Sequence, residues 1–490
     1  MLKKIFVSLF LFIFFVVCGF ADDKGGMLLS FDEASRLALL NNFDIQLTKY
    51  DIQIAREEQG IAKSIFDTIL QAQIELDKDK SRKNSLLLDD DVRETDYSFG
   101  LSKKMPTGTT VSVEQESLRT NNSVDTSLQY NPVYDSSLTV KIKQELGRNF
   151  FGLIDRGDIK VTESDIRISE YTSLDKIEQY LADVQKAYWE FVCAGDIYAI
   201  EQNILEQAEK FQELNERLLD HGVVEVPDLF GAQADYNVKK SMVLAAEDNL
   251  EKQLNVLKLM LNLGDIDVDI MPSDQLAGVG KPYRLDDAMI NSMLNRRDYM
   301  VAKEDVIKQG IILSMKKNSL WPEINLEASF SKNGLDEHFN DSYKDITSDD
   351  RYSYYAGVTV KVPLFDRKAR AEKKQAQYSK AKALVNLKYV ERSIYVEIND
   401  QVRKCNVLAQ QIGCLENAVK LQEKKVNEQM RIFKRGRSDS DTVIRFQNEF
   451  LDAELELTNM KKEYCFAVIE LKRLEGILLK EYWDYSFDKI

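Results

Sequence analysis

Apolar residues recur at alternating spacings of four and three residues along three long segments of this chain. Such spacing predicts helices that pack side by side, with the side chains of one helix fitting between those of the next. A plain coiled-coil rod would show the same spacing, so these positions alone leave that alternative open. The three series are Ala232, Tyr236, Lys239, Val243, Ala246, Leu250, Gln253, Leu257 and Met260, of which Lys239 and Gln253 are polar; Leu408, Ile412, Leu415, Val419, Gln422 (a polar interruption), Val426, Met430 and Phe433; and Phe446, Phe450, Ala453, Leu457, Met460, Tyr464, Ala467, Leu471, Leu474 and Leu478.

The helices predicted from these series are unusually long. Residues 158–221 and residues 368–434 contain no proline and a single glycine each, so neither segment contains a residue that must break a helix. At 1.5 Å per residue, each helix would be about 100 Å long.

A glycine follows each of these long helices and predicts a turn. Gly222 and Gly436 occupy the position just beyond a helix C-terminus where glycine is common, and Pro227 suits the first turn of the next helix. We therefore expect two antiparallel helical hairpins, at 158–264 and 368–478.

Other segments alternate between apolar and polar residues, which is typical of strands with one apolar and one polar face. Two shorter segments, 99–101 and 109–113, flank a turn at 105–108 and suggest an extra hairpin in the first half of the chain only. Polar stretches rich in Asp, Asn and Ser separate the strands and are predicted to be loops. The four principal strands are 69–76, 137–142, 324–331 and 356–362, and the loops are 80–95, 119–136 and 333–351.

The order of elements occurs twice along the chain. Residues 31–51 align without a gap with residues 285–305, at an offset of 254, and residues 217–237 align with residues 431–451, at an offset of 214. A repeat of this length indicates a duplicated half-molecule rather than a solenoid. The expected division is a signal peptide at 1–21, a first repeat at 22–264, a linker at 265–284, a second repeat at 285–478 and a C-terminal tail at 479–490.

Residues 1–21 have the layout of a secretory signal peptide, with Lys3 and Lys4 before an apolar run of thirteen residues and small residues before a cut after Ala21. A transmembrane anchor fits less well because a span needs about 20 residues. Cys18 leaves a lipoprotein as an alternative. Cleavage would change the formal charge from −15 to −17, and a chain this acidic is not expected to bind nucleic acid.

The sequence offers no constellation for catalysis, for a cofactor or for a metal ion. The two histidines, His221 and His338, lie far apart, and no glycine-rich phosphate loop, HExxH motif or nucleophile elbow occurs. Cys405 and Cys414 would lie about 13 Å apart along one helix, too far for a disulfide. We expect buried free thiols, and neither an enzyme, a cofactor nor a metal site. The cysteines of the mature chain are Cys193, Cys405, Cys414 and Cys465.

Four principal strands are too few to close a membrane barrel, which starts at eight strands in single-chain bacterial examples. The strands of this exported chain therefore require either a sandwich partner or further copies of the chain. The order of elements resembles the TolC-like outer-membrane efflux protein family over essentially the whole mature chain. The segments that carry the resemblance are the helix-to-strand entry LWPEINLEASFS (320–331), the strand-to-helix return VTVKVPLFDRKARAEKKQAQ (358–377), and the hairpin tips LLDHGVVEVPDLFGAQADY (218–236) and IFKRGRSDSDTVIRFQNEF (432–450).

The resemblance implies an α+β membrane protein. Each chain of a homotrimer would contribute four strands to one twelve-stranded barrel in the outer membrane, continuous with a periplasmic barrel of helical hairpins. Such a protein is the passive exit duct of a tripartite efflux or type I secretion system, docked to a periplasmic adaptor and an inner-membrane transporter. A soluble periplasmic coiled-coil adaptor or structural protein is the alternative; it explains the heptads and the export but not the amphipathic strands.

The resemblance also implies roles for residues at the hairpin tips, which hold such channels shut. Asp228 matches the family's acid on the first tip. The family's tyrosine and arginine positions on the second tip fall on Phe433 and Ser438, with Arg437 one residue before Ser438.

Two further sites follow from the same resemblance. The acidic ring that screens ions falls on Thr442 and Arg445, although Asp439 and Asp441 lie close by. For the tip glycines, the alternative role is simple helix termination. For the tip acids, the alternative is a solvated charged turn. The expected adaptor-docking residues are Gly222, Val223, Gly436 and Arg437.

Overall fold

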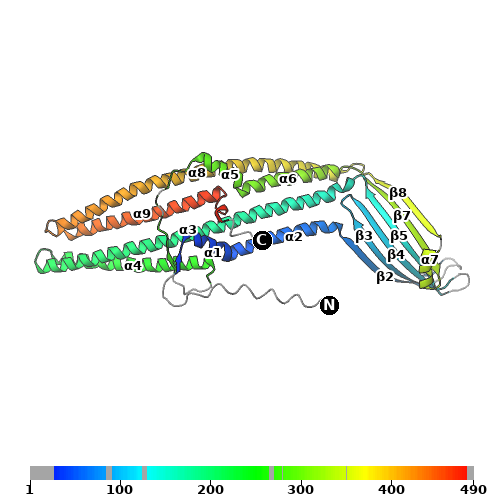
Figure 1. Cartoon of the computed structure of the whole chain (residues 1–490), viewed down its shortest axis with the longest axis horizontal. Coiled ribbons are helices and arrows are strands. Elements are labelled where there is room, and N and C mark those ends of the chain that lie inside the picture. Colours follow the sequence, from blue (N-terminus) through cyan, green and yellow to red (C-terminus); the bar gives the residue numbers. More distant parts are fainter. Residues whose placement is uncertain are drawn as a thin grey trace. The chain divides into compact units, whose positions relative to one another are not determined.

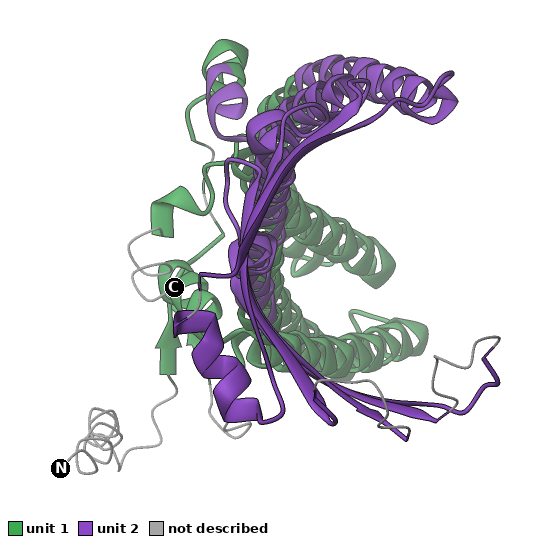
Figure 2. Cartoon of the chain, turned by 90° about the vertical axis from the view of Figure 1, so that its right-hand side faces the viewer, with its two compact units in different colours: residues 1–46, 178–289, 398–490 green, residues 47–177, 290–397 purple. Residues whose placement is uncertain are grey.

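The computed structural model describes residues 27–83, 91–123, 130–263, 270–276, 278, 280–348 and 350–482. The predicted signal peptide, with Cys18, lies outside the described residues, as does most of the C-terminal tail. The chain divides into two compact units, which Figure 2 draws in different colours. Unit 1 takes residues 1–46, 178–289 and 398–490, and unit 2 takes residues 47–177 and 290–397.

The sheet of unit 2 is a single curved layer (Figures 1 and 2) in which six described strands pair in the order β2-β3-β4-β5-β7-β8. Every neighbouring pair is antiparallel. The strands are β2 Thr68–Asp79, β3 Val92–Lys104, β4 Thr109–Asn122, β5 Val133–Glu145, β7 Glu323–Asp336 and β8 Tyr352–Lys361.

The strand number corrects the expectation of four strands from each chain. The four principal strands are present, and the hairpin predicted at 99–101 and 109–113 is also part of this six-stranded sheet, as β3 and β4 between β2 and β5. Its length was underestimated because these strands continue through mainly polar residues, where the alternation fades. The predicted loops 80–95 and 119–136 accordingly contain the start of β3, the end of β4 and the start of β5.

The stretch 333–351 is not a plain loop, as predicted, because it contains the end of β7 and the helix α7, Phe339–Ser348. This helix packs on β5 and β7, and the Oγ atoms of Ser342 and Ser136 lie 2.9 Å apart. Ser342 and Ile346 are its buried residues. The helix is short, and one of its two buried residues is polar. The sequence therefore shows no apolar periodicity in this segment.

Four helices adjoin the sheet in unit 2 and form a row in the order α2-α3-α6-α8. Ion pairs between successive helices establish this order: Arg56–Glu170 at 2.9 Å, Arg167–Glu304 at 2.7 Å and Lys316–Glu372 at 2.9 Å. The contacts therefore place α2 and α8 at the two ends of the row. The helices are α2 Phe43–Lys63, α3 Leu153–Asp220, α6 Arg297–Asn318 and α8 Arg367–Phe433, of which α2, α3 and α8 extend into unit 1.

Unit 1 contains the two predicted helical hairpins. The first joins α3 to α4, Val226–Leu261, and the second joins α8 to α9, Ser440–Leu474. Every position of the three heptad series is buried or half-buried, so the periodicity identified the packed faces. The Oε1 atom of Gln422, the polar interruption, is buried without a hydrogen-bond partner in the described part of the chain. The alternative of a plain coiled-coil rod is excluded, because unit 2 contains a six-stranded sheet.

Short elements anchor the helices of unit 1. The strands β1, Met27–Leu29, and β6, Ile270–Pro272, pair in parallel, which places a strand inside the segment expected to be a linker. The Tyr188 hydroxyl of α3 lies 3.0 Å from the Leu29 carbonyl oxygen and 2.8 Å from Asp274 Oδ2. Among the described residues, no helix combines the length and the apolar character that a membrane crossing requires.

The helix boundaries keep the two offsets found in the sequence. Helix α1, Phe31–Asn41, becomes α5, Leu285–Asn295, when 254 is added to its residue numbers. The start of α4 at Val226 becomes the start of α9 at Ser440 when 214 is added. This correspondence agrees with the expected duplication, which stays a prediction.

Candidate membrane-facing surface and helix-hairpin tips

One row of residues across the sheet is apolar in all six strands. Cross-strand partners in an antiparallel sheet point to the same face, so the register fixes this row. The row after it, one residue along each strand, points to the opposite face and is formed by polar residues and one glycine. The apolar row is Leu70, Leu101, Val113, Val140, Phe330 and Tyr354, and the polar row is Gln71, Gly100, Glu114, Thr139, Ser331 and Ser353.

The apolar row belongs to a larger exposed apolar face. All six of its side chains are exposed, and Tyr354 reaches 81%. Contiguous apolar surface of this kind is rare on a soluble monomer and indicates contact with lipid or another protein. Further apolar members of the face are Ala72, Ile74, Leu76, Tyr97, Phe99, Val111, Leu138, Ile142, Leu326, Ala328, Ala356, Val358 and Val360.

Large aromatic side chains gather at the end of the sheet where β7 begins and β5 and β8 end. Trp321 precedes β7, Phe365 follows β8, and Phe150 and Phe151 follow β5; all four are exposed. Aromatic residues at the end of an apolar band are typical of a membrane–water interface. No local sequence pattern marks this group, because its members are distant in sequence and only the strand register brings them to one end of the sheet.

Donor atoms of Asp336, His338 and Asp341 lie within 4.8 Å of one another beside α7. Asp336 Oδ1 accepts a hydrogen bond from the His338 backbone N–H at 3.0 Å, and Asp341 forms an ion pair with Lys344 at 2.8 Å. His338 and Asp341 are exposed. These local contacts account for the cluster, and we assign no metal to it.

The hairpin tips end and restart their helices in matching ways. Gly222 and Gly436 both have a φ of 69°, the left-handed conformation that glycine adopts without steric cost. The N–H of Val223 donates to the Leu218 carbonyl at 2.8 Å, closing the end of α3. Helix termination, one of the two roles considered for these glycines, is therefore part of the structure.

The tip acids cap the helices that follow. Asp228 Oδ2 accepts a hydrogen bond from the Glu225 N–H at 3.0 Å, and Asp439 Oδ1 accepts one from the Thr442 N–H at 2.6 Å. The bond from Thr442 lowers the pKa of Asp439. Both carboxylates thus stabilise helix N-termini.

Phe433 is a core residue rather than a tip side chain open to solvent. It is 1% exposed and packs with Phe211, with ring centroids 5.2 Å apart, in a cluster that also contains Ala232 and Val443. The cluster takes one residue from each of α3, α4, α8 and α9, so it holds the two tips together.

A buried polar bond, which no sequence pattern predicted, also joins the two hairpins. The Ser440 hydroxyl donates to Asn215 Oδ1 at 2.8 Å, and both residues are fully buried. The other expected tip residues lie at the surface. Gly222, Val223, Gly436, Arg437 and Asp441 are exposed, and Ser438 is half-buried, with its Oγ accepting a hydrogen bond from Gln429.

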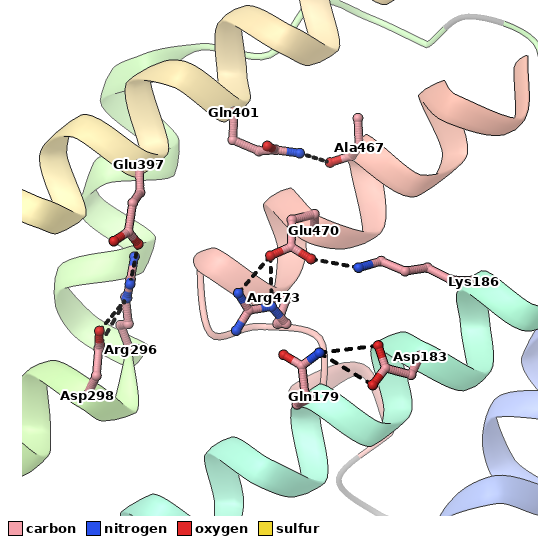
Figure 3. Close-up of polar contacts among 10 residues, drawn as sticks. All are labelled: Gln179, Asp183, Lys186, Arg296, Asp298, Glu397, Gln401, Ala467, Glu470 and Arg473. Carbon is pink, nitrogen blue, oxygen red and sulfur yellow. Dashed lines mark hydrogen bonds and ion pairs between the residues drawn. The ribbon is translucent and has the colours of Figure 1, made fainter. Parts of the chain in front are cut away.

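A charged cluster links α9 to α3 within unit 1 (Figure 3). Glu470 accepts hydrogen bonds from Lys186 of α3 at 2.8 Å and from Arg473 at 2.6 Å. Burial acts to raise the pKa of Glu470, but the bonds from Arg473 and Lys186 outweigh it, and the pKa is lowered. Close by in the same unit, Gln401 of α8 donates to the Ala467 carbonyl of α9 at 2.8 Å.

Figure 3 also shows a charged cluster of unit 2. Arg296, which precedes α6, donates to Asp298 at 2.9 Å and also to Glu397 of α8. This arginine therefore connects α6 to α8.

The cysteines follow the expectation in part. Cys193 and Cys405 are buried free thiols, and burial raises the pKa of each to about 11. Cys465 is buried as well, whereas Cys414 is exposed and corrects the prediction. Cys414 lies outside the 4-3 series of α8, which is why it faces solvent.

Part of the chain matches a known protein family. Residues 313–476 match the family model for outer membrane efflux proteins. Among curated proteins, none matches the chain.

Solved structures of outer membrane channels share the fold. The CmeC channel of Campylobacter jejuni is 16% identical, with 93% of this chain and 89% of that chain covered and a TM-score of 0.67. VceC of Vibrio cholerae is 14% identical, with coverages of 91% and 96% and a TM-score of 0.66. MtrE of Neisseria gonorrhoeae is 14% identical, with coverages of 91% and 88% and a TM-score of 0.67. The resemblance to outer-membrane efflux proteins is therefore confirmed, by the family model for residues 313–476 and by the fold for nine-tenths of the chain.

Proposed function

We propose that this chain is the outer-membrane exit duct of a tripartite efflux or type I secretion system. It conducts its substrates passively from the periplasm to the outside and carries out no enzymatic reaction. The observation that carries the proposal is the sheet of unit 2, with an apolar row next to a polar row through all six strands. An apolar outer face and a polar lumen are what a barrel in lipid requires.

The duct is a homotrimer in the outer membrane with its helices in the periplasm. One six-stranded sheet leaves two open edges, and backbone groups at an open edge cannot be satisfied in lipid. Closure by further copies removes both edges. The soluble adaptor or structural protein is the weaker alternative, because it gives no role to the exposed apolar face or to the aromatic end of the sheet.

The hairpin tips form the gate and the docking surface of the proposed duct. Asp228, Phe433, Arg437, Ser438, Asp439 and Asp441 are the gate residues. Their local bonding supports a tip held in one conformation: Asp228 and Asp439 cap helices, and Phe433 lies in the shared core. The exposed Gly222, Val223, Gly436 and Arg437 contact a periplasmic adaptor, which connects the duct to an inner-membrane transporter.

A pair of neighbouring lysine substitutions tests the membrane face. Val140 lies on the apolar face and Thr139 on the polar face of β5. Val140→Lys should abolish accumulation in the outer membrane, since lysine at the bilayer midplane costs about 2–4 kcal/mol. Thr139→Lys is the matched control and should assemble normally, because the polar face already carries Lys141 and Lys143.

The readout is fractionation followed by electrophoresis without heating. The unmodified chain should appear as a heat-resistant trimer in the outer-membrane fraction. A monomer in the soluble periplasm, or equal tolerance of both lysines, would contradict the proposal.

A further inference from the structure

The helix α7 lies on the same face of the sheet as the apolar row, on the convex side of the curved sheet (Figure 2). Its Ser342 contacts Ser136 and Gly334, which are cross-strand partners in β5 and β7. Ser136 lies four residues before Val140 of the apolar row, and Gly334 lies four residues after Phe330. Side chains an even number of residues apart on a strand point to one face, so α7 covers part of the apolar face.

The helix backbone rests directly on β7. A Cβ atom at Gly334 would collide with the Ser342 carbonyl oxygen, so only glycine allows this approach. Beneath the helix, the Oγ atoms of Ser117 and Ser136 lie 2.8 Å apart, and those of Ser136 and Ser342 lie 2.9 Å apart. All three serines are fully buried. Hydroxyl groups facing lipid without a partner are costly, and α7 shields these two strand hydroxyls.

The position of α7 matches the outer limit of an apolar band. The helix follows β7, at the end of the sheet opposite Trp321 and the helix row (Figure 1). Tyr352 and Lys361 are the ends of β8, which makes the strand about 30 Å long. At the usual strand tilt this spans about 20–25 Å of membrane, close to the height of the apolar band in outer-membrane barrels. Gly334, under α7, lies two residues beyond Lys332, the partner of Tyr352.

Aromatic side chains gather at this level and form a second group, opposite the one at Trp321. Phe339 and Tyr343 of α7 are 43% and 51% exposed, and Tyr352 at the start of β8 is 60% exposed. The Phe339 ring packs edge-on against Tyr134 of β5, with centroids 5.9 Å apart. Tyrosine is enriched where a membrane meets water, because its ring is apolar and its hydroxyl is polar.

The other side of α7 is polar. Asn340 and Lys344 are exposed, and each is turned about 100° around the helix from Phe339 and Tyr343. Lys344 forms an ion pair with Asp341 at 2.8 Å. A helix with one aromatic side and one charged side is suited to lie in the plane of a membrane interface.

We propose that α7 lies outside the barrel wall in the head-group region of the outer leaflet and binds the lipid surface. Phe339 and Tyr343 contact lipid, and Asn340 and Lys344 face water. This inference rests on the proposed duct, since it takes the apolar face of the sheet to be the lipid-facing one. With the aromatic group at Trp321, α7 fixes the depth of the wall in the membrane from both sides.

Spin labelling of the full-length trimer tests the position of α7 in vesicles of phosphatidylethanolamine and phosphatidylglycerol. Tyr343→Cys and Asn340→Cys each carry a nitroxide in a Cys414→Ser background, because Cys414 is the exposed thiol of the described chain. Oxygen concentrates among lipid chains, whereas a chelated nickel ion stays in water. The ratio of oxygen to nickel collisions should be several-fold higher for the Tyr343 label than for the Asn340 label. Phe339→Cys is a second site on the same side and should resemble Tyr343→Cys.

The outcomes distinguish the helix from the duct. A Tyr343 label as open to nickel as the Asn340 label would place α7 in water and overturn the proposal. A Tyr343 label shielded from both reagents would show that protein covers this side, which also overturns it. Tyr354→Cys, on the apolar row, is the lipid reference: if its label is open to nickel the proposed function fails first, and if it lies in lipid while the Tyr343 label does not, only the position of α7 is wrong.

Discussion

At the hairpin tips, two residues expected to act in gating make contacts that stabilise the fold. Asp228 matches the acid expected at the gate, and in the structure its carboxylate accepts the Glu225 N–H at 3.0 Å. Phe433 occupies the expected tyrosine position and is instead packed against Phe211. At both positions the side chain stabilises the tip fold, and gating would follow from loosening that fold.

Replacement of Asp228 separates capping from charge. Asp228→Ala removes the hydrogen-bond acceptor and should destabilise the start of α4 by about 1 kcal/mol, raising single-channel conductance or antibiotic leakage. Asp228→Asn keeps an acceptor oxygen and should behave as the unmodified chain does. If neither variant changes conductance or leakage, Asp228 has no part in the gate.

Glu470 should make the stability of unit 1 depend on pH. Its pKa in the fold lies below the ordinary value of 4.5, so the ionised form adds stability above that pH, and the gain is lost as the pH falls through the lowered pKa. Glu470→Gln should cost about 1–2 kcal/mol at neutral pH. Thermal unfolding of the detergent-extracted protein measures this difference.

The difference between Glu470→Gln and the unmodified chain should shrink as the pH is lowered below 4.5. Glu463→Gln is the control, because Glu463 is exposed on the same helix. A difference that stays constant down to pH 3 would show that the carboxylate charge is not involved.

At the scale of elements, the hydrophobic periodicity predicted the long amphipathic helices and the amphipathic strands. Two 4-3 series identified α4 and α9 and a third the second half of α8, and the alternation located four strands. It failed for α7, whose packing rests on Ser342 and Ile346, and for the polar ends of β3 and β4. Short or polar elements of this kind are fixed by contacts with distant strands, which no local pattern records.

The exposed apolar face of α2 was also missed, although its regular spacing is present in the sequence. The series Leu47, Tyr50, Ile54 and Ile61 has heptad spacing, but it could not be separated from a core face until the structure showed that Ile52 and its neighbours fill the core. For the tips, the bonding could not be derived from the sequence, because Asn215 and Ser440 are 225 residues apart.

The tip glycines offer a test of docking that is independent of helix termination. Asparagine adopts the left-handed conformation at little cost, and a Cβ at Gly222 would meet nothing within 4 Å. Gly222→Asn should therefore assemble into trimers. If the tip docks an adaptor, this variant should lose most of the adaptor that copurifies with the unmodified chain. Full retention of the adaptor would leave Gly222 with helix termination alone.

At the scale of the whole molecule, the strand count is the most direct prediction. A reconstruction of the detergent-extracted trimer by electron microscopy should show eighteen strands around the lumen, six from each chain. Twelve strands, with β3 and β4 folded outside the wall, would contradict the closure proposed from the sheet order.

The hairpin of β3 and β4 has a consequence for the cell. If three copies close the proposed barrel, its wall has eighteen strands, and barrels of sixteen to eighteen strands leave an open aqueous channel that would not sieve solutes by size. Containment would then depend on the helical tips alone, where the buried Phe433 and Ser440 connect the two hairpins. A substitution that loosens these contacts would admit detergents and antibiotics, and its cost to the organism would appear as envelope sensitivity even when export is intact.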